Sequence, residues 1–536
     1  MVNFLDNARI RYEAFSRYNY FPNQKSAFSE IPPSISSRQF TPEVCESLAA
    51  LERPESRRGH GYDVVEYRST RFNNVPRILS IPHPKPQAEL TKHLCDNWDK
   101  IAHIEDNKCS LVKPELHCDH RIIVMNYEEP STKRRRYYNS SFSRFFRVHS
   151  DISNCFNSIY THSLPWAIIG IAEAKNNREP KEWFNKLDAL QRHTKRNETQ
   201  GIPIGPASSN IFVELVLNSV DKKLIESGYH FHRYIDDYTC FCETNDEAQR
   251  FIHHLSSELA KFRLTLNLSK TSITSLPHPA DDGWVLELHS YLPNRYAQPE
   301  GLEDKLTANE VISYLGNALN LNKSTPDGSV LKYAIHLIID HIHDASKSDV
   351  FLAILELSFH YPVLIPYVEK LIEGGPTLYE LDATQDIEKI AFENLKKHRS
   401  DGIAWPLHIL KSGGIKPSQE LADAIVESGD SLSITLLSDF EIDRNKIVEF
   451  CNELAEADNY TKDNYWLLLY QMYIREEISN PYEDDVFPTI QGHDVNFIPN
   501  KAKSRSEEIC SEIQTAAVAR IFEGIKLPLP KPPSDT

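Results

Sequence analysis

The sequence of 536 residues has no run approaching the ~20 consecutive apolar residues that span a membrane, so we expect no membrane contact. Its first twenty residues carry scattered charges and no apolar stretch, so they predict no secretory leader. Nine cysteines, an odd number spread along a long chain, predict reduced thiols rather than a disulfide framework. Glycine is scarce, at 18 residues against 32 prolines, which excludes a collagen-like or glycine-linker design.

A surplus of basic residues is also missing. The chain has 59 Lys and Arg against 76 Asp and Glu, a formal net charge of -17. Residues 1–300 are nearly balanced, with 38 basic and 37 acidic residues, whereas residues 301–536 have 21 and 39. Because phosphate binding relies on Lys and Arg, we expect any nucleic-acid chemistry in the first part. The acidic second part should repel nucleic acid or face another protein.

What is present is ample core-forming material. Forty per cent of the residues are hydrophobic, with 24 Phe and 24 Tyr, which rules out wholesale disorder. The length predicts two to four domains. The composition changes near residues 291–305: short β-like runs mix with helical patterns before it, and helical patterns dominate after it. We therefore expect a helical bundle or repeat over residues 305–480.

Three aspartates stand at the ends of predicted strands. Asp236 and Asp237 lie between two β-rich arms in YHFHRYIDDYTCFCE, which predicts a tight hairpin. Asp151 lies where a predicted strand runs into a helix. An ordinary acidic turn and a helix N-cap are the plain structural readings. If the three carboxylates meet, they would instead form a Mg²⁺ site, with two ions about 4 Å apart serving phosphoryl transfer.

Further segments supply a loop and cations. The stretch QGIPIGP, residues 200–206, predicts a rigid loop before a helix that Ser208 or Ser209 could cap. Alternating leucines from Leu264 predict a strand that ends at Lys270. Arg71 and Arg77 flank a short β run. Each cation is by itself compatible with a solvated surface position.

A basic run, Lys133 to Arg136, is followed directly by Tyr137 and Tyr138. Such a segment binds template, primer or a structural RNA by charge and stacking, or it is a solvated loop. The sequence leaves both readings open.

Five segments, in this order, resemble the palm and fingers of reverse transcriptases over roughly residues 65–290. They are RILSIPHP at 77–84, DISNCF at 151–156, QGIPIGP at 200–206, YIDD at 234–237 and LNLSK at 266–270. Each is weak alone, but five in sequence are specific. The resemblance implies an α+β palm and fingers, followed here by an all-α, helical-repeat C-terminal domain.

The resemblance also implies roles for individual residues. Asp151, Asp236 and Asp237 match the metal-binding aspartates, with Ile152 included among the metal-binding positions. Phe156 matches the steric gate against a ribose 2′-hydroxyl, and Gln200 with Gly201 matches the loop lining the incoming nucleotide. The remaining two matches are cations. Arg77 matches the arginine that binds the triphosphate, and Lys270 matches a lysine that assists phosphate chemistry. The implied cofactor is a pair of Mg²⁺ ions, with Mn²⁺ as the alternative.

Other segments are similar to the abortive-infection, defence-associated bacterial reverse transcriptases. They are IPHP at 81–84, Asn97-Trp98, SIYTHSLPWAIIG at 158–170, GPASSNIFVE at 205–214 and YWLLLYQMY at 465–473. This resemblance implies a bacterial cytoplasmic, antiphage enzyme that polymerises dNTPs into a DNA product, in some relatives without an ordinary template and primed by a tyrosine. The clustered C-terminal candidates are Tyr460, Tyr465, Tyr470, Tyr473 and Tyr482.

We therefore predict four regions: an N-terminal extension (1–64), fingers and palm (65–295), a helical repeat-like domain (296–500) and a C-terminal segment with a Pro-rich tail (501–536). A homo-oligomer is expected, and a partner polymerase remains open. Two alternatives stand beside template-independent synthesis. One is a retron-like enzyme copying a bound non-coding RNA, and the other is a non-catalytic sensor or scaffold that binds a phage protein.

Overall fold

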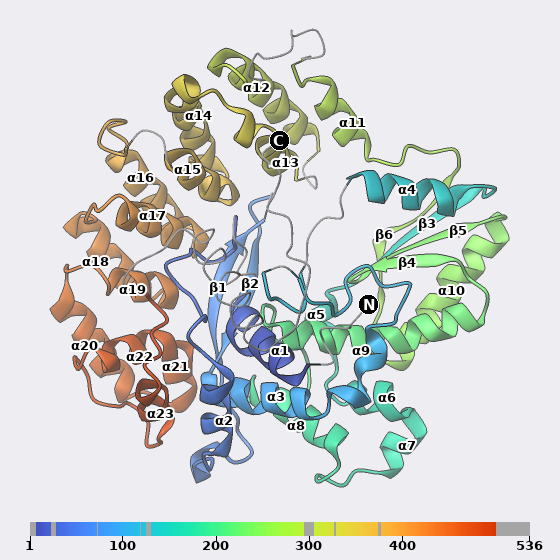
Figure 1. The fold of residues 1–536 in the computed structure, drawn as a ribbon, viewed down its shortest axis with the longest axis horizontal. Coiled ribbons are helices and arrows are strands. Elements are labelled where there is room, and N and C mark those ends of the chain that lie inside the picture. Colours follow the sequence, from blue (N-terminus) through green and yellow to red (C-terminus); the bar gives the residue numbers. More distant parts are fainter. Residues whose placement is uncertain are drawn as a thin grey trace, which may run out of the picture.

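The computed structural model describes residues 7–22, 28–71, 73–117, 119–124, 130–293, 305–325, 329–373 and 377–499. The predicted C-terminal segment 501–536 and the predicted boundary at 295/296 lie outside them. Figure 1 shows a two-stranded sheet near the centre, a four-stranded sheet to one side, and an arc of helices that leads from the second back to the first.

The chain begins with helices that pack beside the two-stranded sheet. The elements are α1 (Ala8–Glu13), continued by a π-helical turn (Ala14–Tyr18), α2 (Pro42–Ala50), β1 (Val64–Thr70), β2 (Pro76–Pro82) and α3 (Pro84–Asp96). β1 and β2 are antiparallel, with Val64 opposite Pro82. Val65 and Tyr67 are fully buried on β1 while Glu66 between them is exposed, the alternation expected of a half-covered strand.

The four-stranded sheet is antiparallel, in the order β4-β5-β3-β6. Its strands are β3 (Phe146–Ile152), β4 (Phe231–Tyr234), β5 (Asp237–Cys242) and β6 (Leu266–Ser275). The helices of this half are α4 (Pro130–Ser141), α5 (Cys155–Ser158), α6 (Ser163–Ile169), α7 (Ile171–Asn176), α8 (Trp183–His193), α9 (Ala207–Glu226) and α10 (Asn245–Lys261). The apolar face of α10, which carries the buried Phe251, Leu255 and Leu259, packs against the sheet.

Two predictions about local structure need correction. α9 already begins at Ala207 after Pro206, so neither Ser208 nor Ser209 caps it. The strand predicted to end at Lys270 continues to Ser275 as β6, because residues 272–275 keep pairing with β3. α10 begins after Thr244, whose hydroxyl accepts a hydrogen bond from the Glu247 backbone N–H at 3.1 Å.

The described part of residues 283–499 is helical, which confirms the predicted helical character. Its helices are α11 (Gly283–Ser290), α12 (Ala308–Ser324), α13 (Val330–Ile338), α14 (Lys347–His360), α15 (Ile365–Ile372), α16 (Thr384–Leu395), α17 (Asp401–Ser412), α18 (Gln419–Ser428), α19 (Ser431–Leu437), α20 (Arg444–Ala455), α21 (Asn459–Asn464), α22 (Trp466–Ile474) and α23 (Val486–Gly492). None of the described helices is long and apolar enough to cross a membrane. A repeat within this region and the four domain boundaries stay predictions.

Two hydrophobic cores divide the helices unequally. One core lies within residues 288–415. The other joins buried side chains of α17–α23 to those of the N-terminal helices and both sheets. The last helices are therefore packed as part of the first half of the molecule, as the position of α18–α23 beside β1 and α2 in Figure 1 shows.

The helical region also covers the free edge of β1. The Arg68 backbone N–H donates to the Ser400 hydroxyl at 3.0 Å, and that of Thr70 donates to the Asp401 carboxylate at 2.6 Å. The Asn464 side chain donates to the Val64 carbonyl at 2.8 Å. Unpaired groups on an edge strand invite pairing with another chain, so these contacts protect the edge and fix the helices against it.

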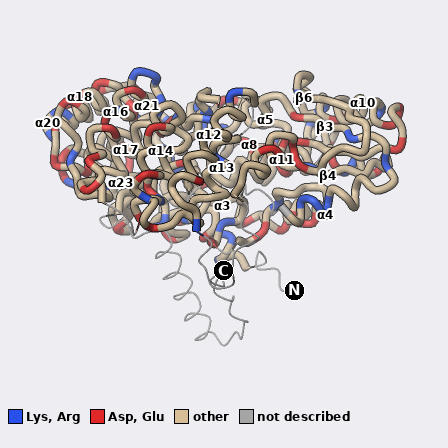
Figure 2. Tube along the Cα trace, turned by 90° about the horizontal axis from the view of Figure 1, so that it is seen from above, with Lys and Arg blue, Asp and Glu red and all other residues tan. Residues whose placement is uncertain are grey.

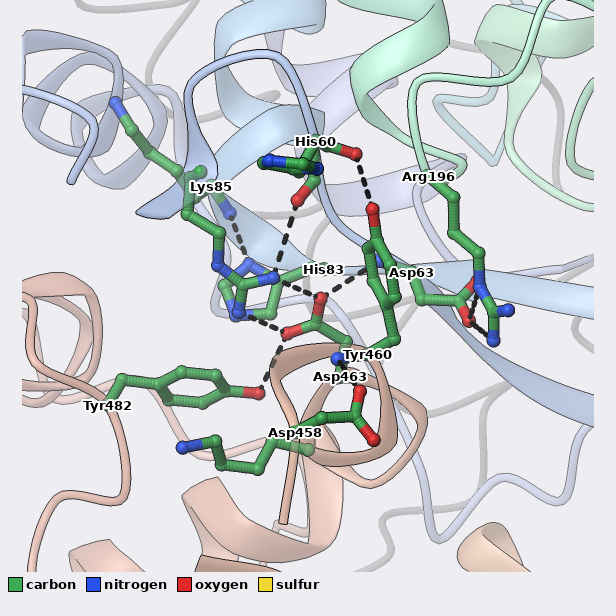
Figure 3. Close-up of polar contacts among 12 residues, drawn as sticks. His60, Asp63, His83, Lys85, Arg196, Asp458, Tyr460, Asp463 and Tyr482 are labelled. Carbon is green, nitrogen blue, oxygen red and sulfur yellow. Dashed lines mark hydrogen bonds and ion pairs between the residues drawn. The ribbon is translucent and has the colours of Figure 1, made fainter. Parts of the chain in front are cut away.

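A buried ion pair secures the same interface. The Arg57 guanidinium donates two hydrogen bonds to the Asp463 carboxylate, at 2.7 and 2.8 Å, and both side chains are almost fully buried. The Asp63 backbone N–H and the Tyr482 hydroxyl also donate to Asp463, at 2.9 and 3.1 Å. Figure 3 shows this carboxylate at the centre of contacts that converge from both halves of the chain, with His83 close by. Four donors replace the water that the carboxylate has lost.

We expect Arg57→Met to destabilise the protein by about 3–5 kcal/mol, because it leaves Asp463 buried without its cation. Urea denaturation followed by circular dichroism measures the change. Lys446→Met, which removes a partly exposed ion pair with Asp423, is the matched control and should cost no more than about 1 kcal/mol. The double variant Arg57→Met/Asp463→Leu should be more stable than Arg57→Met alone. Equal stability of Arg57→Met and the control would contradict the assignment.

Candidate active site

The antiparallel pairing of β3 and β5 brings the predicted carboxylates together. Asp151 lies directly opposite Asp237. The Ile152 backbone N–H donates to the Asp236 carbonyl at 3.2 Å, which joins the hairpin tip to the end of β3. The Lys270 ammonium lies 2.9 Å from a carboxylate oxygen of Asp151. Four predicted catalytic residues, which the sequence separates by up to 119 positions, therefore form one cluster.

The hairpin turn consists of Ile235 and Asp236, since Tyr234 pairs with Asp237. Asp237 is thus the first residue of β5, rather than a member of the turn. Ile235 has φ +56, in the left-handed region that a β-branched residue rarely occupies. Conformations of this kind cost of order 1–3 kcal/mol and persist only where the surroundings impose them.

The buried side chain of Arg233 holds this turn in place. Its guanidinium is fully buried and donates to the Ile235 carbonyl at 2.7 Å. The same group donates to the Glu214 carboxylate at 2.7 and 3.0 Å and to the Asp221 carboxylate at 2.8 Å, both on α9. Tyr238 and Asn107 donate to Asp221 at 2.9 and 2.8 Å. The buried charges are therefore paired and hydrogen-bonded, and they join the hairpin that carries Asp236 to α9.

Crowding of the carboxylates disfavours their charged forms. Burial raises the pKa of Asp236, and the charge of Asp151 raises it further. Burial and the charges of Asp236 and Asp151 raise the pKa of Asp237 from 3.8 to about 7. The contact with Asp151 raises the pKa of Lys270, so its ammonium form is favoured. The site therefore favours added positive charge.

These carboxylates fit a Mg²⁺ site. Oxygen ligands suit Mg²⁺, which typically binds one or two protein carboxylates and completes its shell with water and substrate phosphates. Such an open site needs no closed ligand set, and among the described residues no three His, Cys, Asp or Glu side chains form one. Ile152 has a buried apolar side chain, so only its backbone carbonyl is available as a ligand.

The loop of residues 200–206 lies against the segment that follows Asp151. The Ile202 N–H donates to the Phe156 carbonyl at 3.0 Å, and the Gln200 amide donates to the Asn157 carbonyl at 3.2 Å. Gly201 has φ +81, and a Cβ there would lie 3.2 Å from the Asn157 carbonyl oxygen, so only glycine fits. The structure thus brings Phe156, Gln200 and Gly201 into one wall, with the Phe156 ring largely buried.

A cleft of about 870 Å³ adjoins this wall. Arg71, just after β1, and Arg77, in β2, line it on one side, and Tyr465 lines it from the helical region. Burial lowers the pKa of Arg71, and the like charge of Arg77 lowers it further, which places two cations near each other. The Arg77 charge in turn favours the ionised form of Asp236. A polyanion bound in the cleft would relieve the repulsion between the two arginines.

Sequence reasoning missed the buried network of Arg233. The available signal was the strand alternation in FHRY, which places Arg233 on the same side as the buried Phe231. Glu214 and Asp221, seven residues apart, lie on one helix face as two turns of helix require. An arginine on an inward strand face needs such partners.

Comparison with protein families identifies the fold around this cluster. Residues 124–319 match the family described as "Reverse transcriptase (RNA-dependent DNA polymerase)". The chain contains a reverse transcriptase domain. The matched range includes all three aspartates and Lys270, and the family description is that of a nucleotidyltransferase DNA polymerase. Arg77 lies outside the match.

Solved structures similar to the chain include yeast telomerases. Apo telomerase from Candida tropicalis, truncated from its C-terminal domain, is 13% identical with a TM-score of 0.30; the match covers 43% of this chain and 53%, about half, of that one. The apo telomerase from the same species is 12% identical, with a TM-score of 0.30 and coverage of 77% and 73%. Telomerase from Candida albicans, in complex with a TWJ fragment of telomeric RNA, is 10% identical with a TM-score of 0.28. The match covers 78% of this chain and 67% of that one. No curated protein matches the chain.

We expect Arg233→Lys to fold but to lose at least about tenfold in dNTP incorporation. A single ammonium cannot reach Glu214, Asp221 and the Ile235 carbonyl together, so the hairpin should loosen. Labelled-dNTP incorporation and thermal melting measure the two effects. Arg144→Lys is the control, because Arg144 pairs with the exposed Glu243 at 2.6 Å. Full activity of Arg233→Lys would show that the network does not position the carboxylates.

The raised pKa of Asp237 predicts a pH dependence with a definite sign. Without metal, the folded state holds the Asp237 proton more tightly than the unfolded state, so stability should fall as pH rises from about 4 to about 7. Asp237→Asn should flatten this slope. Because Mg²⁺ competes with the proton, millimolar Mg²⁺ should raise the melting temperature more at pH 8 than at pH 6. A Mg²⁺ shift that is larger at pH 6 would contradict this assignment.

Proposed function

We propose that the chain polymerises dNTPs by two-metal phosphoryl transfer at the cluster of Asp151, Asp236, Asp237 and Lys270. The observation that carries this proposal is the pairing of Asp151 opposite Asp237, with the Lys270 ammonium at 2.9 Å from Asp151. In the proposed reaction a hydroxyl oxygen bonds to the α-phosphorus of a dNTP, and pyrophosphate leaves. Bound Mg²⁺ would activate the attacking oxygen and neutralise charge on the leaving group.

The chain's own residues would position the substrate around that centre. Asp151, Asp236 and Asp237, with the Ile152 carbonyl, would hold the metal ions. Arg77 would pair with the triphosphate, and Arg71 beside it adds a second positive charge. Lys270, kept protonated by Asp151, is suited to neutralise or protonate a phosphate oxygen.

The wall formed by Phe156, Gln200 and Gly201 would hold the nucleoside. We propose that the ring of Phe156 excludes a ribose 2′-hydroxyl and so selects deoxynucleotides. The hydrogen bonds of the loop to the Phe156 and Asn157 carbonyls keep this wall in place. Steric exclusion would discriminate between ribonucleotides and deoxynucleotides, because the backbone hydrogen bonds oppose displacement of the wall.

We infer that synthesis depends little on a long template and starts from a tyrosine. The near-neutral charge of residues 1–300 supports the first point, because long duplexes are held mainly by Lys and Arg. Of the five candidate tyrosines, Tyr465 lines the same cleft as Arg77, while Tyr470 and Tyr482 are buried. Tyr465 is thus the candidate that the fold favours, although its hydroxyl now donates to the Gly429 carbonyl at 2.7 Å and would have to release it.

The biological setting that we propose rests on resemblance alone. The chain would act in the cytoplasm of a bacterium, as a homo-oligomer, in abortive-infection defence against phage. A partner polymerase or a non-coding RNA remains an alternative source of a template.

The decisive experiment measures incorporation of each labelled dNTP and NTP by the full-length protein with Mg²⁺, with and without RNase pretreatment. Asp236→Asn should reduce incorporation by at least about 100-fold, because it removes a charge that the transition state needs. Asp246→Asn, in the exposed first turn of α10, is the matched control and should retain activity. Product that resists RNase and stays attached to protein until proteinase digestion would support protein-primed synthesis.

The remaining outcomes separate the alternatives. RNase-sensitive product would favour copying of a bound RNA. Loss of the protein-linked product in Tyr465→Phe would identify the primer, whereas retention would exclude Tyr465. Absence of incorporation by the wild type would overturn the proposal for the isolated chain.

A further inference from the structure

The helix α4 and the residues that join it to β3 form an exposed basic and aromatic surface. Tyr138, Phe142 and Phe145 are 61%, 81% and 63% exposed, whereas most aromatic rings in the described residues are buried. Three rings this open within eight residues are unusual for a soluble surface. We call residues 133–147 the α4 surface.

The α4 surface is strongly basic in an acidic protein. Residues 130–147 contain six Lys or Arg and no acidic residue, although the whole chain has a net charge of -17. Figure 2 shows these basic positions along α4. One carboxylate, Asp281, faces them at 3.7 Å from both Lys133 and Arg134. Arg135 forms no ion pair with any residue that the structure describes.

Helical spacing gathers the exposed groups on one side. Arg134, Arg135, Tyr138 and Phe142 fall within a stripe that repeats every three or four residues, and Phe142 continues the helical hydrogen bonding by donating to the Tyr138 carbonyl at 3.1 Å. Tyr137 points the other way. Its ring packs on Phe241 at 5.6 Å, and its hydroxyl donates to the His278 carbonyl. Tyr137 therefore anchors the helix and leaves the stripe facing outward.

This anchor places α4 over the sheet face that carries the catalytic carboxylates. Along β5, Asp237, Thr239 and Phe241 point to the same face, and Arg147 and Asp151 point there from β3. The α4 surface covers the end at Phe241, and the carboxylates lie at the other end. From Phe146 to Asp151 the strand extends five residues, about 16 Å, or about five stacked nucleotides.

Arg147 lies opposite Phe241, at the end of this face that α4 covers. It is half-buried on the catalytic face, and its Nε atom has no hydrogen-bond partner among the described residues. A buried N–H group without an acceptor is costly, and a phosphate oxygen would satisfy it.

We propose that the α4 surface binds single-stranded nucleic acid, with Arg134, Arg135 and Arg147 on phosphates and the rings of Tyr138 and Phe142 stacked on bases. The proposal rests on the proposed polymerase function, since it supplies a track for the strand within about five nucleotides of the reaction. Alternating cations and open aromatic rings are what sequence-tolerant single-strand binding requires. A duplex, by contrast, offers its bases no access to these rings.

The test is fluorescence anisotropy of labelled oligo-dT and oligo-U, about twelve nucleotides long, with full-length protein. Asp236→Asn protein with EDTA removes turnover and metal from the measurement. Tyr138→Ala/Phe142→Ala should weaken binding at least about fivefold per ring. Arg134→Gln/Arg135→Gln should weaken it and reduce the slope of log affinity against log salt by about 1.4. Comparing the two oligomers shows whether DNA or RNA is the preferred strand.

Matched controls lie on the helical region. Tyr379→Ala removes a ring that is 73% exposed, and Lys396→Gln/Lys397→Gln removes two exposed cations near the end of α16. All these variants should melt like the wild type, because the replaced side chains are at the surface. The proposal would be overturned if the α4 variants and the controls bound the oligomers equally well. It would also be overturned if the wild-type protein did not bind them.

The polymerase proposal can fail separately. If the wild type incorporates dNTPs while the α4 variants bind oligomers normally, the α4 surface is excluded and the enzyme assignment stands. If the α4 variants alone lose binding while no protein incorporates dNTPs, the surface is supported and the polymerase proposal fails.

Discussion

Crowding of three carboxylates where β3 pairs with β5 is the constraint on which this end of the sheet depends. Burial, and beyond it the charges of the neighbouring aspartates, raise the pKa values of Asp236 and Asp237. The site tolerates this because Lys270 offsets part of the charge at Asp151 and because the hairpin cannot move away. The second condition comes from Arg233, which holds a strained turn against α9. The unfavourable proximity of the carboxylates is thus retained at a place where a bound cation can relieve it.

The helical region helps to form the cleft. It closes the free edge of β1 and supplies one wall of the cleft that Arg71 and Arg77 line, so both halves of the chain form this cleft. The buried pair of Arg57 and Asp463 fixes this arrangement, because a shift between the halves that broke the pair would leave a buried charge without its counter-ion.

Local sequence patterns predicted the elements near the site well. The hairpin, the strand ending near Asp151 and the loop at 200–206 depend on neighbouring residues, whose preferences are read directly. The patterns failed where pairing overrode them. β6 runs on past Lys270 because β3 offers partners as far as Phe146. α9 has no serine cap because its first helical residue, Ala207, precedes both serines.

By itself the sequence determined the chemistry on offer: three aspartates, a lysine, a loop that only glycine permits, and a split of charge between the two halves. The tertiary structure alone decided which of these groups meet. The register that sets Asp151 against Asp237, the approach of Glu214 and Asp221 to Arg233, and the closure of the helical arc onto β1 all join residues far apart in sequence. Such contacts depend on packing of the whole chain, because no local preference specifies a partner more than a few residues away.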